Sequence, residues 1–323
     1  MPDIPGNIST TSVITVGGSL SDALEINGDH DWIRVDLVAG QKITITLNGI
    51  TLEDPYLRLY DASGTTLLAE NDDISTGGNR NSKIVFTATT TGSYYLDVAA
   101  FNNAYVGTYQ LNVVNWTPPP VATYATIADQ LVNGYWGGDN HHFAVTQGGS
   151  ISVNLTGLTA PGQNLARQAL LLWGDVIGIS FNEVATGGQI VFDDNAAGAY
   201  SDGIWSGGIT SSANVNVSTQ WLTNNGTSLN SYSFQTYLHE IGHALGLGHA
   251  GNYNSTADYA TDALFANDAW SSSIMSYFDQ TENTYYAGLG YSRLYATTPM
   301  VADIRAIQTL YGLSPMRVVV DRP

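Results

Sequence analysis

Three histidines and a glutamate lie within one short stretch, His239 to His249, and they could do metal chemistry. In a helix, residues four positions apart lie on the same face, so His239 and His243 can direct both imidazoles at one ion. Gly246 can adopt a positive φ, end the helix and turn the chain back, which lets His249 supply a third nitrogen from a loop. Three protein ligands that leave a fourth position open are typical of a catalytic zinc site.

Glu240 follows the first of these histidines on the same helix, rotated toward the open coordination position. A carboxylate at that place can accept a proton from a water that the metal activates, and can later donate it to a leaving amine. The same ion would polarise a substrate carbonyl. The stretch therefore predicts a zinc-dependent hydrolase with Glu240 as its general base.

Helices must carry and support this stretch. Phe234, Leu238, Ile241 and Leu245 recur at helical spacing and form an apolar stripe that is separate from the two ligands. A preceding helix ends at Gly178, and a later one runs from about Pro299 to Gly312. The stripe of the preceding helix consists of Leu165, Ala169, Leu172 and Val176, and that of the later helix consists of Ile304, Ile307 and Leu310. With strand-like pieces at 189–192 and 215–217, residues 121–313 are predicted to form an α+β domain.

A methionine turn follows at 273–277, and together with the extended histidine motif it resembles the metzincin signature. Within that group, residues 234–254, 274–278 and 303–312 resemble the serralysins, bacterial secreted metalloendopeptidases. The resemblance implies a twisted mixed sheet, and a zinc ion held by His239, His243 and His249. It also implies Glu240 as the base and Met275 as a hydrophobic floor. Tyr277 would ligate the resting zinc and then swing to stabilise the oxyanion.

Two alternatives stay open for this region. A correctly folded but degenerate zinc site is one, although the retained Glu240 argues against it, and Tyr277 could simply pack beside the methionine turn. Serralysins also continue into Gly- and Asp-rich repeats that form a calcium-binding roll, whereas residues 314–323 contain no such repeat. Calcium dependence of that kind is therefore not carried over to this sequence.

Other polar clusters are weaker candidates. His141 and His142 could contribute to a second metal site, but a surface turn leading into a strand at 143–145 explains them better, and His30 is discounted in the same way. Carboxylate and amide oxygens are the ligands that Ca²⁺ prefers, although none of the acidic pairs has the spacing of an EF-hand loop. Solvated turns are the default interpretation of the candidate calcium clusters, which are Asp29/Asp31, Asp72/Asp73 and Asp193/Asp194/Asn195.

The first third of the chain has a different pattern. Residues 8–115 contain about eight short alternating strands separated by turns, which predicts an all-β sandwich. The Pro-rich segment 116–120 is predicted to be a linker, and 314–323 a tail. Pieces at 28–32, 57–61 and 92–95 resemble the bacterial pre-peptidase C-terminal domain, a small sandwich appended to secreted proteases. The predicted fold is thus an N-terminal β-sandwich followed by an α+β metzincin domain.

Composition narrows the class of protein further. Ten basic and 28 acidic residues among 323 give a formal net charge of −18, which disfavours binding to nucleic acid or to an anionic membrane. With no cysteine, disulfides and thiolate zinc sites are excluded, and any latency must use another ligand. No apolar run is long enough to span a membrane, and residues 1–6 lack the pattern of a signal peptide. The family resemblance nevertheless implies a secreted, extracellular bacterial protein.

Two functions compete. The first is a secreted zinc endopeptidase acting on proteins or peptides, which would pair with a sheet edge near 204–210. The second is an adhesion protein whose sandwich binds matrix proteins or polysaccharides, with the metzincin half a latent or degenerate scaffold. Exposed tyrosines would favour the second function, unless they fill the sandwich core. The tyrosines concerned are Tyr56, Tyr60, Tyr94 and Tyr95.

Overall fold

The computed structural model describes residues 3–74 and 80–313. The chain divides into two compact units, which we describe separately. The first contains Met1–Pro118 together with Asn252–Asp262, and the second contains Pro119–Gly251 and Ala263–Pro323. The predicted tail at 314–323 lies outside the described residues, and the predicted domain limits stay a prediction.

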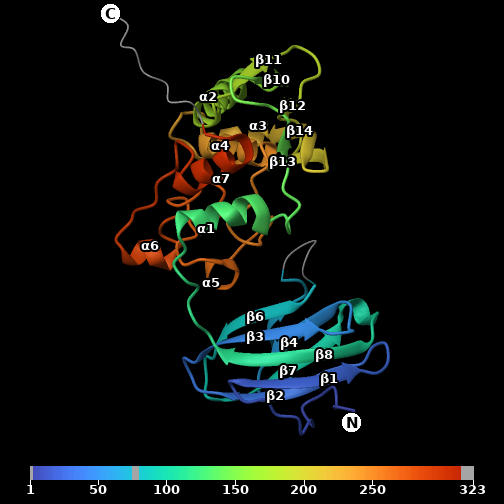
Figure 1. Cartoon of the computed structure of the whole chain (residues 1–323). Coiled ribbons are helices and arrows are strands. Elements are labelled where there is room, and N and C mark those ends of the chain that lie inside the picture. The colour runs from blue at the N-terminus through green and yellow to red at the C-terminus, as the bar shows by residue number, and fades with distance from the viewer. Residues whose placement is uncertain (1–2, 75–79, 314–323) are drawn as a thin grey trace, which may run out of the picture. The chain divides into compact units, whose positions relative to one another are not determined.

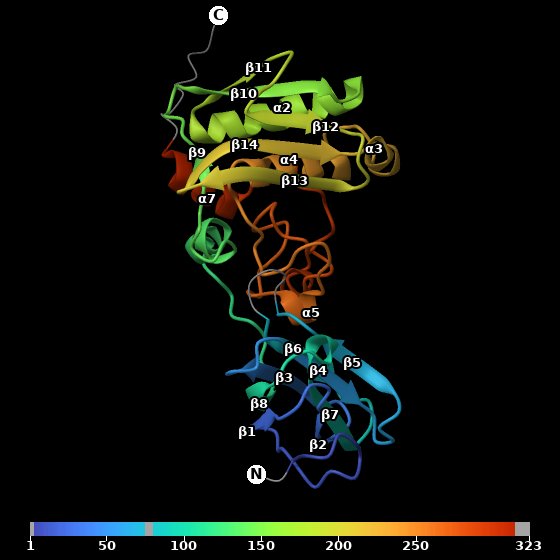
Figure 2. The same cartoon turned by 90° about the vertical axis from the view of Figure 1, so that its right-hand side faces the viewer.

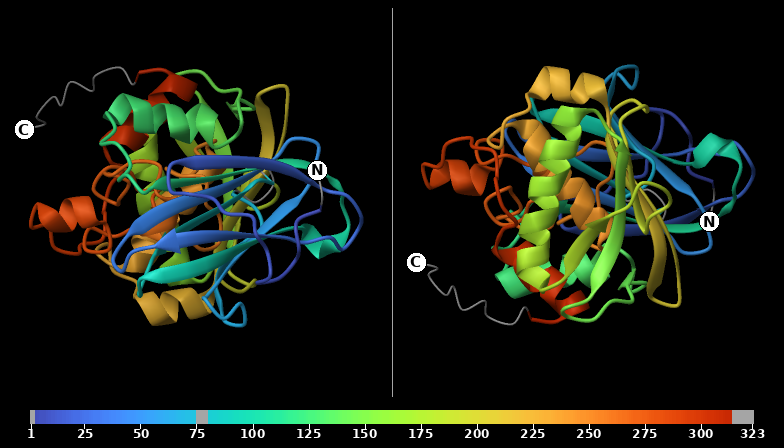
Figure 3. Two further views of the ribbon diagram at one scale, coloured as in Figure 1. Left: turned by 90° about the horizontal axis from the view of Figure 1, so that it is seen from below. Right: turned by 90° about the horizontal axis from the view of Figure 1, so that it is seen from above.

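The first unit is built on two four-stranded antiparallel sheets, β1-β8-β3-β6 and β2-β7-β4-β5 (Figure 1; Figure 3, left). This architecture confirms the predicted sandwich. Its strands are β1 (Gly18–Leu24), β2 (Asp31–Leu37), β3 (Lys42–Gly49), β4 (Pro55–Tyr60), β5 (Leu67–Asn71), β6 (Ser82–Thr87), β7 (Gly92–Ala100) and β8 (Gly107–Asn115). The short helices of this unit are the 3₁₀ turn η1 (Phe101–Asn103) and α5 (Tyr259–Asp262).

Alternation of side chains explains why these segments are strands. In β3, Ile43, Ile45 and Leu47 are completely buried, while the residues between them are half-buried. Strand β4 alternates in the same way, so Tyr56 and Tyr60 point away from the core that Leu57 and Leu59 enter. Of the four tyrosines considered above, only Tyr94 belongs to the core.

The second unit has a sheet with the order β11-β10-β12-β14-β13, beside which β9 pairs with β14 (Figure 2). All pairs are parallel except β13 with β14, so the sheet is mixed and β13 forms its antiparallel edge. The strands are β9 (His142–Phe143), β10 (Ser150–Gly157), β11 (Ser180–Glu183), β12 (Ile190–Asp193), β13 (Ala199–Ser206) and β14 (Ile209–Val217).

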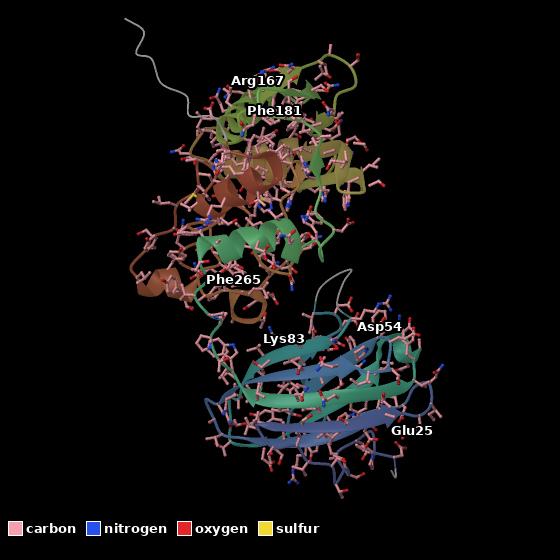
Figure 4. The ribbon with its side chains drawn as sticks, in the orientation of Figure 1. Glu25, Asp54, Lys83, Arg167, Phe181 and Phe265 are labelled. Carbon is pink, nitrogen blue, oxygen red and sulfur yellow. The ribbon has the colours of Figure 1, made fainter. Side chains whose placement is uncertain are left out.

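Two long helices, α2 and α4, pack against each other and cover one face of this sheet (Figure 3, right). Nε of Arg167 in α2 lies 2.6 Å from a carboxylate oxygen of Glu183 in β11, and Figure 4 labels Arg167. The α+β arrangement confirms the predicted fold class. The helical elements are α1 (Tyr124–Asp129), the π-helical turn η2 (Gln130–Gly134), α2 (Ala160–Ile177), α3 (Thr219–Asn225), α4 (Tyr232–Ala244), α6 (Thr284–Gly288) and α7 (Val301–Tyr311).

The helix predictions differ in how well they describe burial. The α4 stripe of Phe234, Leu238 and Ile241 is fully buried. Helix α2 ends at Gly178 with φ +70° as expected, but Leu172 and Val176 of its predicted stripe are only partly buried. The predicted stripe of α7 is only partly right, because the buried face of that helix consists mainly of Ala302, Asp303, Ala306, Ile307 and Tyr311. Small side chains on α7 allow close packing, which a search for large apolar residues overlooks. Among the described helices, none has the length and apolarity needed to cross a membrane.

Candidate metal centre

Helix α4 carries the first part of the site. Its N-terminus is capped by Ser231, whose hydroxyl accepts a hydrogen bond from the Phe234 amide at 3.2 Å. The helix continues until Ala244, and Gly246 follows with a φ of +107°. A Cβ at position 246 would lie 2.0 Å from the carbonyl oxygen of His141, so both the backbone angle and the close approach require glycine there. The chain reversal predicted at Gly246 is present.

The three histidines converge on one point. The Nε2 atom of His243 lies 3.1 Å from Nε2 of His239 and 3.0 Å from Nε2 of His249. Nitrogens bound to one tetrahedral zinc ion at about 2.0–2.1 Å lie about 3.4 Å apart, a few tenths of an ångström more than these distances. The nitrogens of His239, His243 and His249 therefore fit a single zinc ion.

Backbone carbonyls orient two of the imidazoles. Nδ1 of His239 donates to the carbonyl oxygen of Ile274 at 2.8 Å, and Nδ1 of His243 donates to that of Leu247 at 2.7 Å. With the proton on Nδ1, Nε2 presents its lone pair to the common point. Burial lowers the pKa of His239 to about 4 and that of His243 to about 3, so both rings are neutral at pH 7, as metal ligation requires.

Glu240 lies between these ligands in the sequence and is 7% exposed. Burial raises the pKa of its carboxyl group to about 8. A carboxyl group whose pKa lies near the working pH can both accept and donate a proton, which is the property expected of a general base that later acts as an acid.

The methionine turn lies under the same helix. Met275 is completely buried, and its sulfur would be 2.6 Å from a Cβ added at Gly242 of α4. Tyr277 is half-buried, and its ring centroid lies 4.5 Å from that of His249 and 5.9 Å from that of His239. The structure therefore brings Met275 and Tyr277 to the histidine cluster.

Asp303 is a residue of this region that sequence reasoning left without a role. Its completely buried carboxylate accepts hydrogen bonds from the Ser273 hydroxyl at 2.6 Å and from the Ile274 amide at 2.8 Å. A third comes from the Met300 amide at 2.7 Å. Burial, opposed by these hydrogen bonds, raises its pKa to about 6. Because Ile274 also accepts the hydrogen bond from His239, Asp303 fixes the turn that orients this imidazole. An acidic residue at the third position of α7 was the available signal, but helix capping explains such a residue equally well.

The segment predicted to form the substrate rim lies at the sheet edge. Residues 204–206 end β13, Gly207 and Gly208 make the turn, and β14 begins at Ile209. Ile204 is 68% exposed on this edge strand. Trp205 stacks on His141 with a centroid distance of 3.9 Å and an interplanar angle of 5°.

The remaining histidines lie elsewhere. His141 is buried in the stack with Trp205, and the His142 ring contacts Tyr311, so packing accounts for both, and β9 begins already at His142. In the sandwich, Nδ1 of His30 lies 2.8 Å from a carboxylate oxygen of Asp97. Within residues 3–74 and 80–313, none of these three histidines joins a group of potential metal ligands.

Two of the acidic pairs belong to larger carboxylate groups. Asp29 and Asp31 lie with Asp3, and Asp72 and Asp73 lie with Asp54, which Figure 4 labels. The third candidate, at 193–195, instead caps turns: Asp193 accepts from the Asn195 amide, and Asp194 accepts from the Thr159 amide.

Comparison with protein families agrees with the division of the chain into two units. Residues 29–100 match the family of the bacterial pre-peptidase C-terminal domain, and residues 163–261 match the matrixin family. The sandwich is similar to the pre-peptidase C-terminal domain of a collagenase from Bacillus anthracis, with 22% identity and a TM-score of 0.26, over 32% of this chain and 92% of that one.

Curated relatives match about half of the chain. Metallopeptidase AprA of Pseudomonas marginalis is 34% identical over 52% of this chain and 39% of its own length. Serralysin C of Dickeya chrysanthemi is 38% identical over 46% of this chain and 32% of its own length. The chain thus spans well under half the length of these relatives. Two parts of the chain thus match known families: residues 29–100 match the bacterial pre-peptidase C-terminal domain, and residues 163–261 match the matrixins, while the curated relatives are metallopeptidases that include serralysins.

Proposed function

We propose that the second unit hydrolyses peptide bonds within protein or peptide substrates, using zinc held by His239, His243 and His249. The observation that carries this proposal is the convergence of the three imidazole Nε2 atoms on one point, on a helix that also carries the buried carboxyl group of Glu240. A bound zinc ion supplies Lewis-acid activation of a water molecule and of the substrate carbonyl.

Glu240 transfers a proton from the water to the leaving amine. Its carboxylate accepts a proton from the attacking water and then donates it to the nitrogen of the departing amine, which leaves the carboxylate ready for another cycle. Burial of Glu240 favours this exchange. Because burial raises the pKa of its carboxyl group, Glu240 can both accept and release a proton near neutral pH, whereas a solvated glutamate stays ionised there.

Tyr277 stabilises the negative charge that develops on the substrate oxygen. Its ring centroid lies 4.5 Å from that of His249 and 5.9 Å from that of His239, so the phenol is a neighbour of the histidine cluster. A phenol that donates a hydrogen bond to the developing oxyanion lowers the barrier, because the interaction strengthens in the transition state.

The edge strand β13 holds the substrate. An extended peptide can add to an open sheet edge by backbone hydrogen bonds, and β13 is the edge strand on which Ile204 is exposed. Because backbone groups make such pairing, the site accepts many sequences, and side-chain pockets set the preference.

A calcium ion in the sandwich is part of the same proposal. Asp31 is 1% exposed and Tyr109 donates a hydrogen bond to its Oδ2, while Oδ1 has no hydrogen-bond partner among the described residues. Asp29 and Asp3 complete the group, and Glu25, labelled in Figure 4, donates its amide to Asp29. Calorimetric titration with Ca²⁺ tests this site: wild type binds and Asp31→Asn does not, whereas equal binding by both variants removes Asp31 from the site.

The sandwich also offers a second candidate function. Trp32 stacks on Tyr60 at 4.9 Å and lies 5.9 Å from Tyr95, on the sheet face opposite the core. Trp32 itself is buried at 8% exposure, so Tyr60 and Tyr95, which are half-buried, are the rings of this face that a matrix protein or polysaccharide could contact. Retention of the full chain on immobilised collagen or polysaccharide, lost in Tyr60→Ala, supports this function; no retention on either removes it. Both functions fit a protein that acts outside the cell.

Hydrolysis tests the main proposal. The full chain should cleave an unfolded protein, lose this activity on dialysis against a chelator, and regain it when zinc is restored. A control that is dialysed without chelator keeps its activity. Cleavage that persists after the zinc is gone contradicts the proposal.

A further inference from the structure

The contacts of one tyrosine outside the recognised motif lead to the third histidine. We infer that Tyr135 is a positioning residue that holds the imidazole of His249 in the orientation needed for metal binding. The inference rests on the proposed zinc site but not on any particular reaction there.

Different groups hold the rings of the three histidines in place. His239 and His243 both belong to α4, and backbone carbonyls orient their rings. His249 comes from the segment after the glycine turn, so no helix fixes its position. Two tyrosine rings lie beside its imidazole: Tyr277 at 4.5 Å and Tyr135 at 5.0 Å between ring centroids.

The π-helical turn brings Tyr135 to this place. Helix α1 continues into η2, and the Tyr135 amide closes the turn by donating to the carbonyl of Gln130 at 2.9 Å. Within the turn, the carbonyl of Leu131 accepts a hydrogen bond from the Gly248 amide at 2.7 Å. Single π turns inside helices occur frequently at functional sites. This turn joins the segment directly to the residue before His249.

The ring of Tyr135 then meets His249 edge to face, with an interplanar angle of 87°. This is one of the preferred geometries of paired aromatic rings, and it restricts rotation of the imidazole. The neighbouring backbone is in close contact as well, because a Cβ at Gly248 would lie 2.3 Å from Cδ1 of Tyr135. Glycine at 248 therefore gives the Tyr135 ring access to the ligand.

A second contact, made by Trp136, fixes the glycine turn that precedes His249. The indole Nε1 of Trp136 donates to the carbonyl oxygen of Gly246 at 3.0 Å. Positions 246 and 248, on either side of Leu247, are thus both joined to the segment 131–136. Removal of the Tyr135 ring should leave the hydrogen bonds to Gly246 and Gly248 in place. Its main effect should be that the His249 imidazole can rotate more freely.

The experiment measures zinc affinity of the full chain by competition with a chromophoric chelator, without any substrate. Tyr135→Leu should bind zinc about 10- to 100-fold more weakly, the usual cost of losing a group that orients a ligand. Tyr135→Phe should bind within about twofold of wild type, since the edge-to-face contact uses the ring. The matched control is Tyr291→Leu, at an exposed tyrosine whose ring packs on Tyr286.

Cobalt(II) absorption spectra provide a second measurement, because they report ligand geometry rather than global stability. Tyr135→Leu should alter the visible bands, while Tyr135→Phe and Tyr291→Leu should match wild type. If Tyr135→Leu does not fold, Tyr135→Met retains more of the side-chain volume and should show the same loss. Unchanged affinity and spectra in a folded Leu or Met variant overturn the inference. A wild type that binds zinc but cleaves nothing would remove the proposed function and leave this inference standing.

Discussion

Two buried aspartates, one in each unit, show how differently the two regions use a carboxylate. Asp303 of the second unit and Asp31 of the sandwich are 0% and 1% exposed. Asp303 accepts three hydrogen bonds from the methionine turn and the start of α7, whereas Asp31 accepts one from Tyr109 and keeps an oxygen without a partner among the described residues.

The number of hydrogen bonds that each carboxylate accepts distinguishes the roles of Asp303 and Asp31. A buried charge is tolerated where hydrogen bonds surround it, and such a group fixes its neighbours in place. A buried carboxylate with an unsatisfied oxygen instead favours a proton or a cation. Asp303 therefore has a structural role behind the metal site, and Asp31 is a group that responds to pH and calcium.

Asp303→Ala should have the largest effect. It leaves the Ile274 and Met300 amides and the Ser273 hydroxyl without their acceptor, at about 1–3 kcal/mol for each buried group left unpaired. In thermal unfolding, the free energy of unfolding should fall by several kcal/mol. Zinc content should also fall, because the Ile274 carbonyl that accepts the His239 hydrogen bond moves. A variant with wild-type stability and full zinc content would mean that the carboxylate does not organise the turn.

Asp31→Asn should have a smaller effect that depends on pH. Burial and nearby carboxylates raise the pKa of Asp31 to about 7, so the folded state holds this proton more tightly than the unfolded state, whose ordinary value is 3.8. The stabilisation that the protonated Asp31 provides is complete below 3.8, the pKa of the unfolded state, and is lost as pH rises through about 7, the pKa of the folded state. In chelator, wild-type melting temperature should fall from pH 5 to pH 8, and Asp31→Asn should fall less. Parallel profiles would contradict the role of Asp31.

His30→Gln should have the smallest effect. The hydrogen bond to Asp97 raises the pKa of His30, which is part-exposed, so its stabilisation is present below the ordinary value of 6.5 and is lost as pH rises through the folded value. The loss at pH 5.5 should be less than about 1 kcal/mol, and no loss is expected at pH 9. Equal losses at both pH values in chemical denaturation would mean that the ion pair is not responsible.

The local parts of this molecule could be predicted from the sequence. The alternation of Ile43, Ile45 and Leu47 is enough to identify a strand and its buried face, and the spacing of His239 and His243 is enough to place both on one helix face. The fold class followed from such patterns. These features depend on neighbours a few positions away, which is why one sequence was sufficient.

The long-range parts could not be predicted. Tyr109 donates to Asp31 across 78 positions of the chain, and Asp303 binds Ile274 across 29. Each of these aspartates is compatible with a solvated turn or a helix cap when it is considered alone, and only the fold brings the partners together. The contact of Tyr135 with His249 was missed for the same reason.

Whether the histidine cluster and Glu240 form a working peptidase site is tested by comparing wild type with Glu240→Ala. Hydrolysis of an unfolded protein and zinc content are determined on the same samples. We expect about one zinc per chain in both proteins, and a loss of hydrolysis of at least about 100-fold in the variant. A Glu240→Ala protein that retains its zinc and cleaves at the wild-type rate would mean that Glu240 is not the general base and that this site does not carry the hydrolysis.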